Sequence, residues 1–283
     1  MNRCLTFSAI AAIFVLSLTA LGQKNSTDLP KLSADEIIGK HVASLGSFKP
    51  GSLTSRVLVG TGEFSSKVQG EKVGGPVQFA SAGSKLLLAL VFNANNYPYD
   101  KIGFDGKELS FGVLPGGGYS PLDNFLKSNK AVVRRGLFGG VLTQAWPLLT
   151  NDKDVKFEAA GTTKIDNRPV YKLKASFSGI GEMSVLLYFE SETFRHIRTE
   201  YFYRTGQLTS PNPNRPAQIG GAAVESYTLT EDFSNFSKAE DFILPMTYSI
   251  TYETQAGKAV NWKINFTEVY NNQAIDDSAF RIS

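Results

Sequence analysis

The sequence predicts a mainly β protein of the α+β class, built on one large sheet with an apolar inner face. The first observation is at residues 182–204, where two strand-like segments flank a tight polar turn at residues 191–193. In the second segment every other side chain is bulky or β-branched: Ile197, Thr199, Tyr201 and Tyr203. Successive side chains of a strand point to opposite faces, so this alternation predicts one apolar face and one wetted face. His196 stands on the charged side of the alternation and is expected to face solvent.

The second observation is a hairpin near the C-terminus, whose first strand is expected to present Met246, Tyr248, Ile250 and Tyr252 on one face. Across a turn at residues 255–258, the next strand presents Val260, Trp262, Ile264 and Phe266. Aromatic and β-branched residues paired across strands stabilise such a ladder. Turn signals and alternation elsewhere bring the expected total to about ten to twelve strands. The other strands are expected at residues 55–64, 76–82, 85–92, 99–104, 108–113, 157–165, 170–177 and 223–236, and residues 207–221 are expected to form a long loop.

The third observation is that helices are few. Ser33 and Glu36 form an S-x-x-E capping box, in which each side chain satisfies an early helix N–H group. The sequence therefore predicts a helix over residues 34–45, with Gly46 as its stop. His41 is expected to line this helix or cap it.

A second helical region follows the glycine-rich residues 115–118. Ser120 is the expected N-cap, and Pro121 is the expected first helical residue. Residues 132–149 are apolar but interrupted by glycines and a proline, which predicts one or two short helices rather than a long one. This region could plug the concave side of the sheet or act as a lid, through Phe125, Leu137, Phe138, Leu142 and Trp146.

Residues 1–22 have the layout of a secretory signal peptide. Arg3 gives a basic start, residues 9–18 are apolar, and small residues precede an expected cleavage site before Gln23. The apolar run is too short for a stable membrane span, although an uncleaved anchor helix is the alternative interpretation. We therefore expect export to the periplasm, with residues 23–283 forming a single domain because no linker divides them.

The composition excludes several classes of function. Cys4 is the one cysteine and would leave with the signal peptide, which excludes thiolate metal sites and cysteine nucleophiles. The formal net charge of +3 falls to +2 without Arg3. This small charge, together with the lack of a Lys/Arg cluster, gives no indication of nucleic acid as a partner.

Motifs that would carry chemistry are also missing. His41 and His196 lack the spacing of metal ligands, so no metal site and no cofactor are expected. Asp100 and Asp105 lack the pattern of a calcium loop and are expected to be turn residues. There is no G-x-S-x-G motif, so the sequence indicates a protein that is not an enzyme.

The aromatic content is the remaining signal, with 20 Phe, 11 Tyr and 2 Trp. A curved sheet can use aromatic residues to pack its own core. Alternatively, a curved or barrel-like sheet whose interior is not filled can hold a small apolar ligand. Both interpretations stay open at this point.

The order of several motifs supports a family resemblance. They read SADEIIGKHVASLG from residue 33, VLVGTGEF from residue 57, DNRPVYKLKASF from residue 166, VLLYFESETFRHIRTEY from residue 185, EDFILPMTYSITYE from residue 240 and NNQAIDDSAFRI from residue 271. Together they resemble the outer-membrane lipoprotein carrier-like proteins of bacterial periplasms, the LolA-like group. The resemblance implies a strongly curved, incomplete antiparallel β-barrel with helices covering the concave face.

The same resemblance implies a function in binding lipids or acyl chains in an apolar cavity, with release to a membrane-bound donor or acceptor protein. The candidate ligand-binding residues, of the cavity or the lid, are Phe125, Leu137, Phe138, Leu142, Trp146, Ile197, Tyr201, Tyr203, Tyr248, Ile250, Trp262 and Ile264. The alternative is a non-catalytic interaction or structural module of the cell envelope, with a filled core.

Overall fold

The computed structural model describes residues 29–47, 51–67, 70–204 and 226–283. The predicted signal peptide at residues 1–22 and the predicted loop at residues 207–221 lie outside the described residues. Within the described part, none of the helices is both long enough and apolar enough to cross a membrane.

The described residues form one antiparallel sheet of twelve strands in the order β5-β4-β3-β2-β1-β12-β11-β10-β9-β8-β7-β6. The strands are β1 (Arg56–Ser66), β2 (Glu71–Ala82), β3 (Lys85–Val91), β4 (Tyr99–Phe104), β5 (Leu109–Phe111), β6 (Val155–Ile165), β7 (Arg168–Phe177), β8 (Ser184–Glu190), β9 (His196–Arg204), β10 (Ser226–Ala239), β11 (Phe242–Thr254) and β12 (Ala259–Asn271). The count agrees with the upper end of the predicted range.

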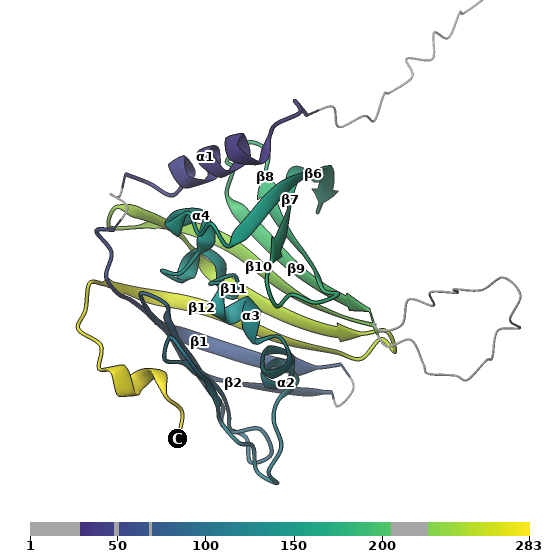
Figure 1. Ribbon diagram of the computed structural model, residues 1–283. Helices are drawn as coiled ribbons and strands as arrows, with labels where there is room; N and C mark the ends of the chain where they lie inside the picture. Colours follow the sequence, from purple (N-terminus) through teal and green to yellow (C-terminus); the bar gives the residue numbers. More distant parts are fainter. Residues whose placement is uncertain (1–28, 48–50, 68–69, 205–225) are drawn as a thin grey trace, which may run out of the picture.

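The strand order shows how the sheet is assembled. β1 to β5 form one meander and β6 to β12 form another, and the pairing of β1 with β12 joins the two. β5 and β6 therefore lie at opposite edges, and the sheet stays open instead of closing into a barrel. The predicted incomplete antiparallel barrel is confirmed, with helices along its concave face (Figure 1).

The helices follow from this topology. The chain between β5 and β6 must travel from one edge of the sheet to the other, and it does so across the concave face (Figure 1). This crossing segment contains α2 (Pro121–Ser128), α3 (Lys130–Arg134), the 3₁₀ turn η1 (Gly140–Leu142) and α4 (Pro147–Thr150). α1 (Ala34–Ser44) precedes the sheet and has the predicted capping box, in which Glu36 N donates to Ser33 Oγ over 3.3 Å.

Glycine explains why the crossing segment consists of short pieces. Gly136 has a φ of +65°, and a Cβ at this position would lie 2.0 Å from the carbonyl oxygen of Ala145. Only glycine tolerates both conditions, so the chain can fold back on itself immediately after α3. We call residues 136–150 the plug, because their side chains fill the centre of the concave face between the sheet and solvent.

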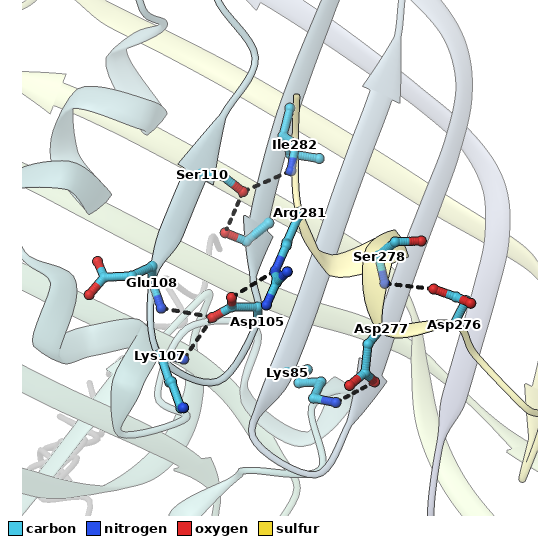
Figure 2. A network of polar contacts seen from close by, with 11 residues as sticks. Lys85, Asp105, Lys107, Glu108, Ser110, Asp276, Asp277, Ser278, Arg281 and Ile282 are labelled. Carbon is cyan, nitrogen blue, oxygen red and sulfur yellow. Dashed lines mark hydrogen bonds and ion pairs between the residues drawn. The ribbon is translucent and has the colours of Figure 1, made fainter.

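The C-terminal residues cover part of the outer face. After β12 the chain forms the 3₁₀ turn η2 (Asp277–Phe280), and Phe280 is completely buried against Ala80 and Leu87. Figure 2 shows the polar contacts of this segment with the β3 to β5 region. Arg281 Nε donates to Asp105 Oδ2 over 3.0 Å, and Asp105 caps the β4–β5 turn as predicted. The outer face of the first meander is therefore held by the C-terminus.

Candidate functional site

The structure brings eleven of the twelve candidate ligand-binding residues into one hydrophobic core. Ten of them are buried in it, and Tyr203 is packed against it with partial exposure. The ten buried residues are Phe125, Leu137, Phe138, Leu142, Trp146, Tyr201, Tyr248, Ile250, Trp262 and Ile264. The plug thus occupies the centre of the concave face, where the sequence suggested a ligand cavity. Whether these residues also contact a ligand remains a prediction.

Ile197 is the exception, because β9 contains a bulge. Tyr188 of β8 pairs with Arg198, whereas the next residue, Phe189, pairs with His196, so Ile197 is an extra residue in the ladder. An extra residue shifts the alternation of faces by one position. Ile197 therefore packs in a separate small cluster with Ile165, Val170 and Tyr188.

The same bulge turns His196 inward. The predicted solvent-facing position of His196 is wrong, because the side chain is completely buried against the plug. His196 stacks on Trp146 with ring centroids 4.9 Å apart, and its Nε2 lies 2.9 Å from Thr199 Oγ1. Burial, and then the neighbouring His41, hold the pKa of His196 well below its usual value, so the ring is neutral.

His41 connects α1 to the plug. Its Nδ1 donates to the carbonyl oxygen of Phe194 over 3.0 Å, and its Nε2 accepts from Trp146 Nε1 over 3.3 Å. These two partners require the neutral ring, and burial lowers the pKa of His41 to about 4. The prediction that His41 lines the first helix is confirmed, and its role is to hold the indole of Trp146.

Glu231 of β10 is a second buried polar anchor of the plug. Its carboxylate accepts from Gly139 N over 2.7 Å, from Tyr201 OH over 2.6 Å and from Tyr248 OH. Burial raises the pKa of Glu231 to about 7, although these three donors act in the opposite direction. Tyr201 and Tyr248, predicted as apolar cavity residues, therefore also hold a carboxylate that binds the plug backbone.

Arg56 at the start of β1 is the third anchor. Its Nη1 donates to the carbonyl oxygen of Val141 over 3.0 Å, and its Nε donates to Asn271 Oδ1 over 3.2 Å. The guanidinium lies 4.6 Å from the ring centroid of Phe242. Burial lowers the pKa of Arg56 to about 9, an effect that the charge of Glu240 opposes. The plug is thus fixed to the sheet by hydrogen bonds as well as by apolar packing.

Pockets lie on both sides of the plug, at the two ends of the concave face. The first, which we call the β11–β12 pocket, has a volume of about 820 Å³ and lies beside the turn between these strands. Its wall is mostly aromatic and aliphatic, and includes Phe64, Tyr97, Leu114, Tyr119, Tyr252 and Val260. Lys258 is the one charged residue among the described residues of the wall.

A buried carboxyl pair lies behind this wall. Asp100 accepts from Tyr97 OH and, over 2.6 Å, from Trp262 Nε1, while Asp123 accepts from Ser120 N in the capping box of α2. Both carboxyls are 1% exposed. Burial raises the pKa of Asp100 to about 6; burial, and then the charge of Asp100, raises that of Asp123 to about 8. The expectation that Asp100 is a turn residue is wrong, because it lies buried within β4.

The second pocket, which we call the α4 pocket, has a volume of about 700 Å³. It lies at the opposite end of the plug, between the β2–β3 turn, the end of α3, α4 and the start of β11. Leu53, Leu149 and Phe242 form apolar parts of its wall, and Arg134 and Arg135 contribute positive charge. Neither pocket is lined by any of the twelve candidate residues.

Within the described ranges, no three His, Cys, Asp or Glu side chains gather closely enough to hold a metal ion. The buried titratable groups instead serve as hydrogen-bond partners of the plug and of the pocket walls.

The open, curved antiparallel sheet with helices along its concave face (Figure 1) is the architecture that the resemblance to the LolA-like group implies. The structure aligns with a DUF1329 family protein of Desulfovibrio piger at a TM-score of 0.50 and 10% identity, over 87% of this chain and 96% of that chain. This likeness shows the shared fold. The sequence itself matches no protein-family model and no curated protein.

Two further solved structures align over similar lengths. One is a LolA superfamily protein of Nitrosomonas europaea, with a TM-score of 0.48, 14% identity and coverage of 89% of this chain and 99% of that chain. The other is a putative outer membrane lipoprotein-sorting protein domain of Vibrio parahaemolyticus, with a TM-score of 0.46, 14% identity and coverage of 87% and 94%. Both align less well than the Desulfovibrio piger protein, and the fold shared with that protein is the open antiparallel sheet that the predicted resemblance implies.

Proposed function

We propose that the protein is a periplasmic carrier that binds a lipid or acyl chain in the β11–β12 pocket. The observation that carries the proposal is the volume of this pocket, about 820 Å³, combined with its aromatic and aliphatic wall. Ligand sites of proteins commonly measure about 300–1,000 Å³ and are mostly apolar with few polar groups. Each methylene that an alkyl chain buries there contributes about 0.8 kcal/mol.

The site that we propose differs from the set of residues that the sequence suggested. Trp146 and Tyr248 are buried in one hydrophobic core with the rest of the plug, and the proposal therefore places the chain at the end of the concave face. The β11–β12 pocket lies at the end of the same face. It is bounded by Tyr97 of the β3–β4 loop and by Ser120 and Pro121 of the crossing segment. A ligand there reaches solvent without displacement of the plug.

The proposal includes export and a partner. Residues 1–22 support export, and a membrane-bound protein that donates or accepts the lipid would complete the transfer. Fractionation of bacterial cells that express the full chain tests the location. Recovery of the protein in the cytoplasm, with residues 1–22 still attached, would contradict export.

A variant that narrows the pocket tests the ligand. Val260 lies on the wall with partial exposure, and Val260→Trp should weaken binding of N-dodecyl dansylamide, a neutral fluorescent probe, by at least about tenfold, the effect of excluding about two methylenes. Leu149→Trp, the matched change in the α4 pocket, should leave the affinity unchanged. Native mass spectrometry of the protein from a periplasmic extract should also show a bound lipid.

The second candidate function is an interaction module of the cell envelope. The observation that favours it is the filled core, in which eleven of the predicted cavity residues pack against one another. Failure of N-dodecyl dansylamide to bind the wild type, together with a spectrum that shows protein alone, would support the module and reject the carrier.

A further inference from the structure

We propose that the α4 pocket is a separate binding site for an anionic amphiphile, a carboxylate or phosphate group carried on a hydrocarbon chain. The site lies at the end of the plug opposite to the β11–β12 pocket and does not depend on the function proposed there. Its volume of about 700 Å³ is that of a ligand site.

A buried amide donor in the wall is the first argument. Gln144 Oε1 accepts from Gly83 N over 3.2 Å, which fixes the orientation of the side-chain amide. The other half of the amide, Nε2, is buried, and no acceptor among the described residues lies within hydrogen-bond distance. A buried donor without an acceptor costs about 1–3 kcal/mol, which an oxygen atom of a ligand would recover.

Two arginines at the pocket are the second argument. Arg135 Nη1 contacts Asp154 over 2.6 Å and Asp152 over 3.8 Å. Arg134 Nη2 donates to the carbonyl oxygen of Lys107 over 3.1 Å and lies 3.7 Å from Glu108. These contacts use one terminal nitrogen of each guanidinium, and a guanidinium carries five N–H donors. Each arginine therefore retains donors for a carboxylate or phosphate.

A buried charge behind the wall is the third argument. Arg56 is 1% exposed, and its guanidinium lies against Phe242, which lines the pocket. Its Nη2 is buried and has no acceptor in the described part of the chain. The charge of Glu240 acts on Arg56, and Asn271 links the two side chains by hydrogen bonds. Salt screens a buried charge weakly, and Arg56 therefore attracts an anion in the pocket.

The balance of the wall decides the class of ligand. Asp152 of the wall, together with Asp154 and Glu108 outside it, pairs with Arg134 and Arg135. The preference for an anion over an amine therefore rests on the remaining N–H donors of the arginines, on Gln144 Nε2 and on Arg56 behind the wall. Leu53, Leu149 and Phe242 offer no partner to a small hydrated ion, but they bury a hydrocarbon chain. The combination fits a charged head group with an apolar tail.

An isosteric change of one residue tests the proposal. Gln144→Glu keeps the oxygen that accepts from Gly83 N and replaces the amide donor by a second oxygen. In titration calorimetry, octanoate should bind the wild type more tightly than octylamine, octanol or inorganic phosphate. Gln144→Glu should lower the affinity for octanoate by more than about tenfold, because a hydrogen bond to a charged group is lost. The same change should raise the affinity for octylamine.

Controls separate this site from the other pocket. Lys258→Gln changes the one charge on the described wall of the β11–β12 pocket and should leave the effect of Gln144→Glu on octanoate unchanged. Arg134 is half-exposed, so Arg134→Gln should lower the affinity for octanoate while the protein stays folded. Equal binding of octanoate and octylamine by the wild type, or of phosphate and octanoate, would overturn the proposal. So would octanoate affinity that Gln144→Glu leaves intact.

Discussion

The two pockets at the ends of the concave face have similar volumes but differ in the polar groups behind their walls. The β11–β12 pocket lies in front of a carboxyl pair, Asp100 and Asp123. Asp100 accepts a hydrogen bond from Tyr97, and Asp123 accepts one at the start of α2. The α4 pocket lies in front of the guanidinium of Arg56 and the amide of Gln144. The plug thus lies between two pockets that differ in the polar groups behind their walls.

The plug is what keeps the two ends separate, and removal of its central side chain gives the largest expected effect. Trp146 is completely buried, stacks on His196 and donates to His41. Trp146→Ala should lower the free energy of unfolding by about 3–5 kcal/mol, through lost apolar contacts and the cavity that remains. Urea denaturation followed by circular dichroism measures this.

The matched control for this change is Phe202→Ala, because Phe202 is 44% exposed. It should cost less than about 1 kcal/mol, as surface substitutions usually do. If Trp146→Ala cost no more than Phe202→Ala, the plug would not be packed as described, and the separation of the two pockets would fail with it.

The carboxyl pair gives a pH-dependent difference between the two ends. Burial, and then the charge of Asp100, raises the pKa of Asp123 to about 8, so the folded state keeps a proton that the unfolded state has lost. The free energy of unfolding must then fall as pH rises from the ordinary pKa of an aspartate towards about 8, by up to about 1.4 kcal/mol per pH unit. Asp123→Asn should remove this contribution between pH 7 and 8, and thermal unfolding at both pH values measures it.

Asp105→Asn is the control for Asp123→Asn. Hydrogen bonds from Glu108 N and Lys107 N, and then Arg281, lower the pKa of Asp105 to about 2, so this group is ionised in both states above pH 7. Asp105→Asn should therefore leave the dependence of stability on pH between pH 7 and 8 unchanged. Equal slopes for the wild type and Asp123→Asn would show that the pair holds no proton at neutral pH.

Much of the architecture could be predicted from the sequence, because it depends on local patterns. The alternation of Tyr248, Ile250 and their neighbours predicted the β11–β12 hairpin, and Ser33 with Glu36 predicted α1. The glycines and proline of residues 132–149 predicted short helices. The resemblance in motifs then gave the open, helix-covered sheet.

The sites could not be predicted, because they depend on contacts between residues far apart in the sequence. Asp100 meets Asp123 only after α2 has folded across the sheet, and Glu231 meets Gly139 over an even longer separation. Ser120 was predicted as the N-cap of α2, but nothing local marked Asp123 as one of a buried pair. The apolar alternation therefore predicted residues of the core but gave no signal for these polar contacts.

The bulge in β9 gives the smallest expected effect and tests the assignment of faces. Ile197 packs with Ile165, Val170 and Tyr188, apart from the core that borders both pockets. Ile197→Val should lower the free energy of unfolding by about 0.5–1.5 kcal/mol, the usual cost of one buried methyl group. It should leave the affinities for N-dodecyl dansylamide and octanoate unchanged. A change in either affinity would place Ile197 on the concave face, as the plain alternation predicts, and would remove the bulge as the reason that His196 lies against Trp146.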